Sequence, residues 1–407
     1  AREFRARGVP VVAGGFHPTL LPAEAAEHVD SVAIGEVEAI WPRLLADFAA
    51  GRLQPVYGAH DHVAVPESRL DGNAAGCGPG SGPAPSPIAG AESPEADRNG
   101  GPATPFRSDR RVFAGKRYLP LSLVETSRGC RHHCRFCSVR RFYGNGIVHR
   151  PLPDLVREIE ALGRRFVFFV DDNIVADPAR ARELFAAIRP LGLRWVSQAS
   201  LATAADPAFL DLMVESGCFA LIIGLESIFP ANLEQMGKGW STRLGYLETL
   251  LAEYRRRGIL VYATFVFGYD QDTPERIRET AEFAIAQRLF LANFNMLQPF
   301  PGTQLYDELE REGRLLYPRW WLAPDLRWDR PTFRPRAMSP DDLATAVADA
   351  RRRFSGLSSL FQRAGDLQAN FADPFRALVY LAGNLVSRGD IAHKTGLRLG
   401  FGGKDSP

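Results

Sequence analysis

Apolar runs alternate with amphipathic segments along most of the chain, in an order typical of βα units. Continuous apolar runs are typical of strands buried on both faces, and the segments between them place apolar residues at helical spacing. The runs predict six strands, at 121–125, 166–170, 194–198, 220–225, 260–267 and 292–297. The intervening segments predict helices at 154–162, 178–189, 206–216, 241–257 and 274–287. Six strands are fewer than the eight of a closed barrel, so we expect an α/β fold with a partial (β/α)6 TIM-like barrel.

The first 57 residues predict a different α/β unit. They contain two brief apolar runs flanked by glycine and two short helical segments, as at the end of a doubly wound sheet. The strands are expected at 9–13 and 31–34, and the helices at 22–29 and 40–50.

Composition separates these two regions. Gly, Pro, Ala and Ser occupy about three-quarters of 72–105, and such a segment buries too little apolar surface to become ordered. We therefore expect a flexible linker over 58–115, rather than an ordered surface loop, followed by a core at 116–317. The Arg-rich remainder, 318–407, predicts a mainly helical C-terminal extension with a long helix over 340–354.

The overall charge and hydropathy exclude several classes of protein. Lys and Arg total 49 and Asp and Glu total 47, so a net charge of +2 gives no basic surface for nucleic acid. No apolar stretch is long enough for a transmembrane helix, and the first residues lack the apolar region of a signal peptide. We expect a cytoplasmic protein, and a chain without a starting Met is expected to be an N-terminally truncated one.

The strongest chemical signal is a cluster of three of the five cysteines. Cys130, Cys134 and Cys137 form a C-x3-C-x2-C loop directly after the first strand of the core. Three thiolates in a compact loop bind three irons of a [4Fe–4S] cubane and leave the fourth iron open. The alternative is a zinc site that takes His132 or His133 as a fourth ligand. Cys77 and Cys218 lack ligand spacing, so we expect them to be bystanders.

This loop, with Thr126 to Gly129 before it and an aromatic residue before its last cysteine, resembles the radical S-adenosylmethionine (SAM) superfamily. The resemblance covers about 118–310. It implies that the three cysteines hold a [4Fe–4S] cluster, that SAM binds the open iron, and that SAM is cleaved to a 5′-deoxyadenosyl radical. It also implies that Phe136 lies near the adenine.

The ends of later strands supply weaker candidates for SAM contacts. Asp171 stands where the family has a contact to the SAM amino group, although the surrounding sequence departs from the family pattern and a solvated turn or helix cap is an equal alternative. Glu226, followed by Ser227, is placed to accept hydrogen bonds from ribose hydroxyls, and a structural ion pair is the alternative for this carboxylate. Gln198 is a similar, weaker case, and Gly268 resembles the glycine of the family's adenine-side motif.

The N-terminal segment resembles the end of a cobalamin-binding domain found upstream of many radical SAM enzymes. Gly14 and Gly15 would let the chain approach the cobalamin nucleotide tail, and a Gly-Glu-x-Glu run begins at Gly35. The upstream Asp-x-His-x-x-Gly signature is absent, and only two strands are expected here. We therefore expect this chain to bind cobalamin weakly or not at all, and methyl transfer to need the missing upstream segment.

These resemblances imply a radical SAM enzyme that methylates an unactivated carbon with the help of cobalamin. The C-terminal region loosely resembles the extension of members near the hopanoid methylases, which implies a lipid-like or natural-product small molecule as substrate. An electron donor such as flavodoxin or ferredoxin is the expected partner. A radical SAM cyclase or oxidoreductase, and a non-catalytic metal-binding protein, are the alternatives.

Overall fold

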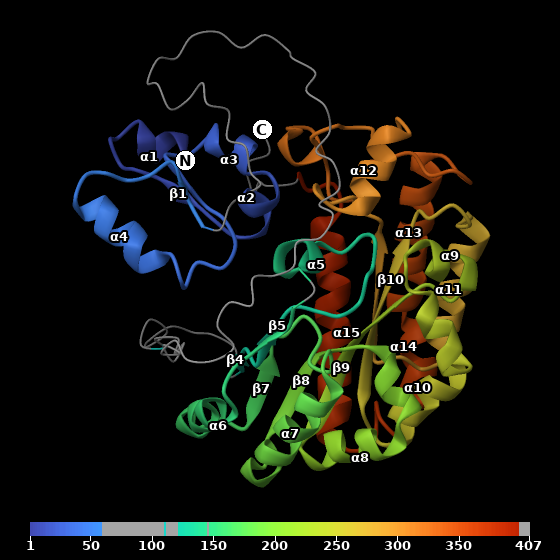
Figure 1. The fold of residues 1–407 in the computed structure, drawn as a ribbon. Helices are drawn as coiled ribbons and strands as arrows, with labels where there is room; N and C mark the ends of the chain where they lie inside the picture. The colour runs from blue at the N-terminus through green and yellow to red at the C-terminus, as the bar shows by residue number, and fades with distance from the viewer. Residues whose placement is uncertain (59–109, 111–120, 145, 399–407) are drawn as a thin grey trace. The chain divides into compact units, whose positions relative to one another are not determined.

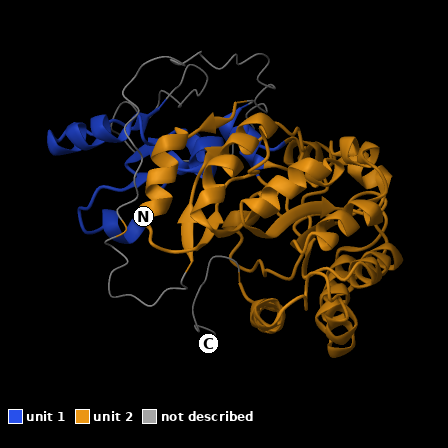
Figure 2. Ribbon diagram, turned by 90° about the horizontal axis from the view of Figure 1, so that it is seen from below, with its two compact units in different colours: residues 1–103, 138–145, 301–303 blue, residues 104–137, 146–300, 304–407 orange. Residues whose placement is uncertain are grey.

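The computed structural model describes residues 1–58, 110, 121–144 and 146–398, and these form two compact units (Figure 2). Unit 1 takes in residues 1–103 together with 138–145 and 301–303, and unit 2 the remainder. The predicted linker, 58–115, lies almost entirely outside the described residues, and so does Cys77. The predicted domain boundaries therefore stay predictions.

The N-terminal part of unit 1 is a small parallel sheet with short helices. Its strands are β1 (Val12–Ala13), β2 (Ser31–Ala33) and β3 (Val56–Tyr57), in that order. Its helices are α1 (Arg2–Arg5), α2 (Phe16–Leu20), α3 (Pro22–Ala26) and α4 (Trp41–Ala49). The third strand was not expected, because two residues carry no periodic signal. It is held by Tyr57, whose hydroxyl donates to Asp47 of α4 at 3.0 Å.

Unit 2 is built on a six-stranded parallel sheet with the order β11-β10-β9-β8-β7-β4 (Figure 1). The strands are β4 (Ser122–Val124), β7 (Phe166–Phe169), β8 (Arg194–Ala199), β9 (Cys218–Glu226), β10 (Leu260–Phe267) and β11 (Leu291–Met296). All five neighbouring pairs are parallel. Each predicted strand is present within two residues of its expected start, so the predicted α/β class is confirmed.

Helices follow the strands along the chain, and their apolar side chains pack on one face of the sheet to form the main core. They are α6 (Leu152–Ala161), α7 (Pro178–Ile188), α8 (Pro207–Glu215), α9 (Pro230–Gln235), α10 (Leu247–Arg256), α11 (Pro274–Ala286) and α12 (Gln304–Arg311). The buried face of the sheet meets apolar side chains of these helices. Trp195 of β8, for example, stacks on Phe185 of α7 with ring centroids 5.1 Å apart. Burial of one sheet face under helices leaves the carboxyl ends of the strands to carry a site.

Capping side chains fix where several helices begin. Asp177, Asp206 and Thr273 each accept hydrogen bonds from the first turn of the helix that follows, and each precedes a proline at the first helical position. Proline suits this position because the first amide needs no partner there. The predicted helix over 241–257 is wrong in its first part, because residues 239–244 form a 3₁₀ helix, η5 (Gly239–Leu244), and α10 begins only at Leu247.

Three C-terminal helices belong to unit 2: α13 (Pro340–Ser355), α14 (Leu357–Ala364) and α15 (Pro374–Lys394). Arg363 of α14 is fully buried and donates to the carbonyls of Leu289, Phe290 and Phe354 and to Oδ1 of Asn384. The guanidinium thus joins α13, α14 and α15 to the segment that leads into β11. No helix in the described ranges is long and apolar enough to span a bilayer.

Candidate functional site

The three-cysteine loop lies between two short elements at the carboxyl end of β4. It runs from β5 (Ser127–Arg128), which pairs antiparallel with β6 (Val148–His149), to α5 (Ser138–Tyr143). Gly129 has φ of +94°, and a Cβ there would lie 2.4 Å from the carbonyl oxygen of Gly146. Only glycine therefore fits directly before Cys130. All three loop cysteines are partly exposed and form no disulfide.

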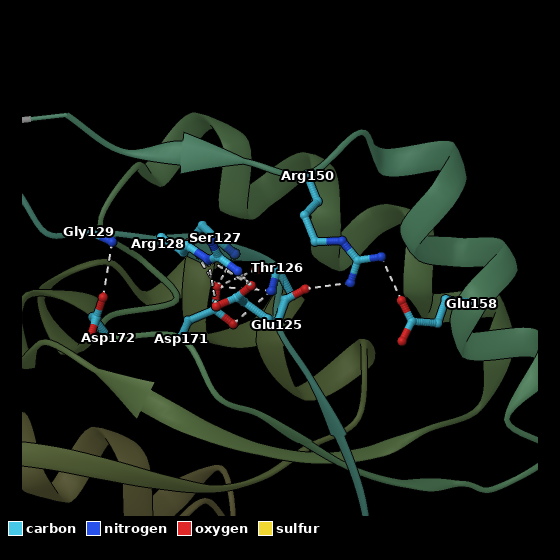
Figure 3. A network of polar contacts seen from close by, with 9 residues as sticks. All are labelled: Glu125, Thr126, Ser127, Arg128, Gly129, Arg150, Glu158, Asp171 and Asp172. Carbon is cyan, nitrogen blue, oxygen red and sulfur yellow. Dashed lines mark hydrogen bonds and ion pairs between the residues drawn. The ribbon is translucent and has the colours of Figure 1, made fainter. Parts of the chain in front are cut away.

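Asp171, just beyond β7, holds the first turn of this loop (Figure 3). Its buried carboxylate accepts hydrogen bonds from the hydroxyls of Thr126 and Ser127, both at 2.7 Å, and from their backbone amides. Burial raises the pKa of Asp171, and these hydrogen bonds oppose the rise. With four donors from the chain on one carboxylate, Asp171 anchors this turn, and it does so from a buried position rather than the solvated one that the alternative describes.

The next two residues extend this anchoring toward the first cysteine. Asp172 Oδ2 accepts a hydrogen bond from the Gly129 amide at 3.0 Å. Asn173 points Nδ2 at Cys130 Sγ, 3.8 Å away, while its Oδ1 accepts from the amide of Ser200 beyond β8 at 3.2 Å. Asn173, which we did not predict as a site residue, thus connects the cysteine loop to the end of β8.

Glu226, the last residue of β9, is buried beside a lysine that we also did not predict. Lys238 Nζ donates to the Gly224 carbonyl at 2.5 Å and to Glu226 Oε1 at 3.2 Å. Glu226 has φ of +65°, which is uncommon for a residue with a side chain. Strain of this kind persists only where the surroundings hold it, and it is found most often at functional sites.

The charges of Lys238 and Glu226 act on the cysteine loop. Burial raises the pKa of the Cys134 thiol to about 11, and the positive charge of Lys238 opposes that rise. Cys137, Glu226 and Cys130 act on Cys134 in the same direction as burial. The side chains of Cys134, Lys238 and Glu226 therefore share one local environment at the carboxyl end of the sheet.

A second polar chain links Ser227 to Gly268. Asn232 Nδ2 lies 3.4 Å from Ser227 Oγ and donates to Asp272 Oδ1 at 2.6 Å. Asp272 Oδ2 in turn accepts from the amide of Gly268 at 2.8 Å. Burial raises the pKa of Asp272 to about 6, against the hydrogen bonds that favour its ionised form. This series of hydrogen bonds holds the ends of β9 and β10 in register.

The remaining predicted residues of unit 2 differ in their surroundings. Gly268 has φ of +119°, and a Cβ there would meet the ring of Phe333 at 2.5 Å, so packing within the protein by itself requires glycine. Gln198 has an exposed side chain on the sheet face opposite Trp195, and its carbonyl accepts from Ile174. Phe136 packs against the main hydrophobic core.

Several buried polar atoms at this end of the sheet have no hydrogen-bond partner among the described residues. They are Asn232 Oδ1, Tyr269 OH, Gln298 Nε2, Trp240 Nε1 and Arg135 Nε. Each unpaired buried polar group costs free energy, so a cluster of them indicates a place for a polar ligand. Within the described ranges, no three His, Cys, Asp or Glu side chains converge on a point that would hold a single metal ion. In a [4Fe–4S] cubane each thiolate binds a different iron.

In unit 1, the structure brings the two predicted glycine segments together. A Cβ on Gly14 would contact the Cβ of Ala33 at 3.3 Å, and Gly15, with φ of +93°, begins the turn into α2. The amide of Gly35 donates to Thr19 Oγ1 at 2.9 Å. Both glycine turns thus lie at the carboxyl ends of β1 and β2, where a doubly wound sheet binds its ligand.

Comparison with known proteins agrees with this geometry. Residues 124–284 match the family model of the radical SAM superfamily. The bacteriochlorophyllide d C-12(1)-methyltransferase of Chlorobaculum tepidum is 30% identical over 321 residues, which cover 76% of this chain and 62% of the relative. The hopanoid C-2 methylase of Rhodopseudomonas palustris is 32% identical over 213 residues, 49% of this chain and 40% of that protein.

One solved structure shares the fold over most of the chain. The radical SAM methyltransferase TsrM of Kitasatospora setae, with cobalamin and a [4Fe–4S] cluster bound, has a TM-score of 0.56 and 20% identity, and it covers 87% of this chain and 66% of its own. This chain therefore spans less than two thirds of each of the three proteins.

Proposed function

Residues 124–284 belong to the radical SAM superfamily, and from this premise we propose that the chain reductively cleaves SAM in the service of a methyl transfer. The methyl acceptor would be an unactivated carbon, and cobalamin the carrier of the methyl group. The observation that carries the proposal is the three-cysteine loop, anchored by Asp171 at the carboxyl end of a parallel sheet.

The residues of the loop suit a [4Fe–4S] cluster. Cys130, Cys134 and Cys137 would each bind one iron, and the bound cluster would supply the electron that breaks the carbon–sulfur bond of SAM. The amide of Asn173 is placed to donate to the Cys130 sulfur, and hydrogen bonds to cluster sulfurs help set the potential of such clusters. The stack of His132 on Trp240, with centroids 4.2 Å apart, holds the outer part of the loop.

The ends of β8, β9 and β10 suit SAM itself. Glu226 presents a carboxylate for the ribose hydroxyls, and Ser227 stands beside it. Gln198 offers an exposed amide from β8, while Phe136 and Gly268 would lie on the adenine side. The hydroxyl of Tyr269 and the side-chain oxygen of Asn232, which have no hydrogen-bond partner in the described ranges, are further polar atoms at this end. Asp171 would act through Thr126 and Ser127, as the anchor of the loop.

Unit 1 suits the nucleotide end of cobalamin. The turn at Gly14 and Gly15 leaves no side chain between the backbone and a ligand at the end of β1, and the Gly35 turn lies next to it. The relatives act, by their names, on a bacteriochlorophyllide and a hopanoid, both large and mostly apolar molecules. We propose a substrate of this lipid-like or natural-product class and a flavodoxin or ferredoxin as electron donor.

The test begins with the cluster. The chain, reconstituted anaerobically with iron and sulfide, should hold about four of each per protein. With dithionite it should convert SAM to 5′-deoxyadenosine. Changing Cys130, Cys134 and Cys137 together to Ala should abolish both properties, whereas Cys218→Ala, a buried cysteine in β9, should alter neither. SAM cleavage by the triple variant would refute the proposal.

Methyl transfer needs its own measurement. The chain with its reconstituted cluster would be incubated with SAM, cobalamin and either bacteriochlorophyllide d or a hopanoid. The masses of the products would then be measured by mass spectrometry. A product heavier by one CH₂ group supports methyl transfer. A product of unchanged carbon count would favour the alternative, a radical SAM cyclase or oxidoreductase.

A further inference from the structure

Lys238 is a buried ammonium group for which the proposed contacts give no role. The residue is 8% exposed, and lysine occurs at only four positions in this Arg-rich sequence. Burying a charge is costly unless partners compensate it, and within the described part of the chain Lys238 has a single carboxylate partner, Glu226, at 3.2 Å. A costly group retained at the carboxyl end of a sheet indicates a function beyond packing.

The segment that carries Lys238 wraps the cysteine loop closely. The Arg135 amide donates to the Met236 carbonyl at 3.0 Å, and a Cβ on Gly237 would lie 2.8 Å from the His133 carbonyl oxygen. Residues 236 and 237 thus contact the two neighbours of Cys134 on either side. Lys238 follows directly, so its backbone lies beside the part of the loop that contains Cys134, and its ammonium group binds the Gly224 carbonyl and Glu226.

The ammonium is also held in position from the other side. At Gly224 a Cβ would lie 2.3 Å from Glu226 Oε1 and 3.1 Å from Lys238 Nζ, so this pair occupies the space of a side chain. Replacing Lys238 by a neutral residue would leave the Glu226 carboxylate as the one remaining charge of this pair. The ammonium group of Lys238 therefore contributes a positive charge beside the loop that its neutral variant lacks.

We infer that Lys238 raises the reduction potential of the cluster bound by Cys130, Cys134 and Cys137, an inference that rests on the function proposed above. Reduction adds one electron and no proton to the cluster, so the cluster becomes more negative by one charge. A fixed positive charge at short range in a protein interior stabilises the reduced form more than the oxidised form. A less negative potential lets a low-potential one-electron donor, of the ferredoxin class, reduce the cluster more completely.

The test compares four proteins after anaerobic reconstitution: the unaltered chain, Lys238→Gln, Lys238→Arg and Lys394→Met. The Gln variant keeps a donor for the Gly224 carbonyl and removes the charge, and the Arg variant keeps the charge. Lys394 lies in α15 with its own partner, Asp390, and serves as the matched control. Iron and sulfide are counted first, and the midpoint potential is then measured by dithionite titration with electron paramagnetic resonance.

We expect the Gln variant to show at least a tenfold lower ratio of reduced to oxidised cluster at a fixed potential, which is a shift of about 59 mV to more negative values. The Arg variant and Lys394→Met should match the unaltered chain. Equal potentials in all four would overturn the inference, as would loss of the cluster from both Lys238 variants, which would make Lys238 a packing residue. Loss from the Gln variant alone would also overturn it, because the charge would then serve cluster assembly rather than the potential. An unaltered chain without any cluster would instead refute the proposed function.

Discussion

The hydroxyl of Ser127 lies 2.7 Å from Oδ1 of Asp171, although 44 residues separate the two in the chain. The pairing of β4 with β7 accounts for this contact. Val124 is opposite Phe169 in the register, so the residues two positions further along each strand, Thr126 and Asp171, also come together. The start of the cysteine loop is thereby attached to the end of the neighbouring strand.

Replacing Asp171 by Ala should lower the stability of unit 2. Four donors on Thr126 and Ser127 would lose their acceptor, and both residues are buried. Buried donors without partners cost about 1–3 kcal/mol each, so we expect a loss of at least about 3 kcal/mol in the free energy of unfolding, measured with urea. Asp172→Ala, which removes the acceptor of one amide, should cost about 1 kcal/mol. An Asp171→Ala variant of normal stability that binds SAM poorly would instead make Asp171 a SAM contact.

Asp272 should make stability depend on pH. Its folded pKa of about 6 lies above the ordinary value of 3.8, so the folded state holds a proton that the unfolded state has released between these values. Stability should therefore fall as pH rises, by about 1.4 kcal/mol from pH 5 to pH 7.5 for this group.

Asp272→Asn should remove this part of the pH dependence without a collapse of the fold. The Asn232 amide can turn over, because its Oδ1 has no partner among the described residues and would accept from the new amide. The measurement is urea unfolding of both proteins at the two pH values. Identical pH dependence in the two proteins would contradict the raised pKa of Asp272.

Gly268→Ala should destabilise the protein more than an alanine at another left-handed glycine. The new methyl group would lie 2.5 Å from the Phe333 ring, which is fully buried. We expect a loss of more than about 3 kcal/mol, against about 1 kcal/mol for Gly192→Ala, where φ is +59° and the space is open. Thermal melts of both variants, and of Gly268→Ala combined with Phe333→Leu, provide the check. If Phe333→Leu restores no stability to the Gly268→Ala variant, contact with the Phe333 ring is not the reason why position 268 requires glycine.

The sheet was predictable because its strands are buried over much of both faces and therefore read as continuous apolar runs. The positions of Asp171 and Glu226 at strand ends followed from the same pattern. Lys238, Asn232 and Asp272 were not predictable, since Lys238 and Asp272 lie in loops, Asn232 lies in the short helix α9, and the partners of all three depend on tertiary contacts. The helix over 241–257 was wrong at its start because Gly245, with φ of +128°, interrupts the chain before α10.

Arg363 makes the C-terminal helices inseparable from the sheet. Its guanidinium satisfies the carbonyls of Leu289 and Phe290 just before β11, and it is held there by Asn384 of α15. A substitution that removes the Arg363 guanidinium would leave both carbonyls without this donor. The exposed apolar side chains of α15, by contrast, can change without breaking a hydrogen bond to the sheet; they are Leu378, Leu381, Leu385 and Val386.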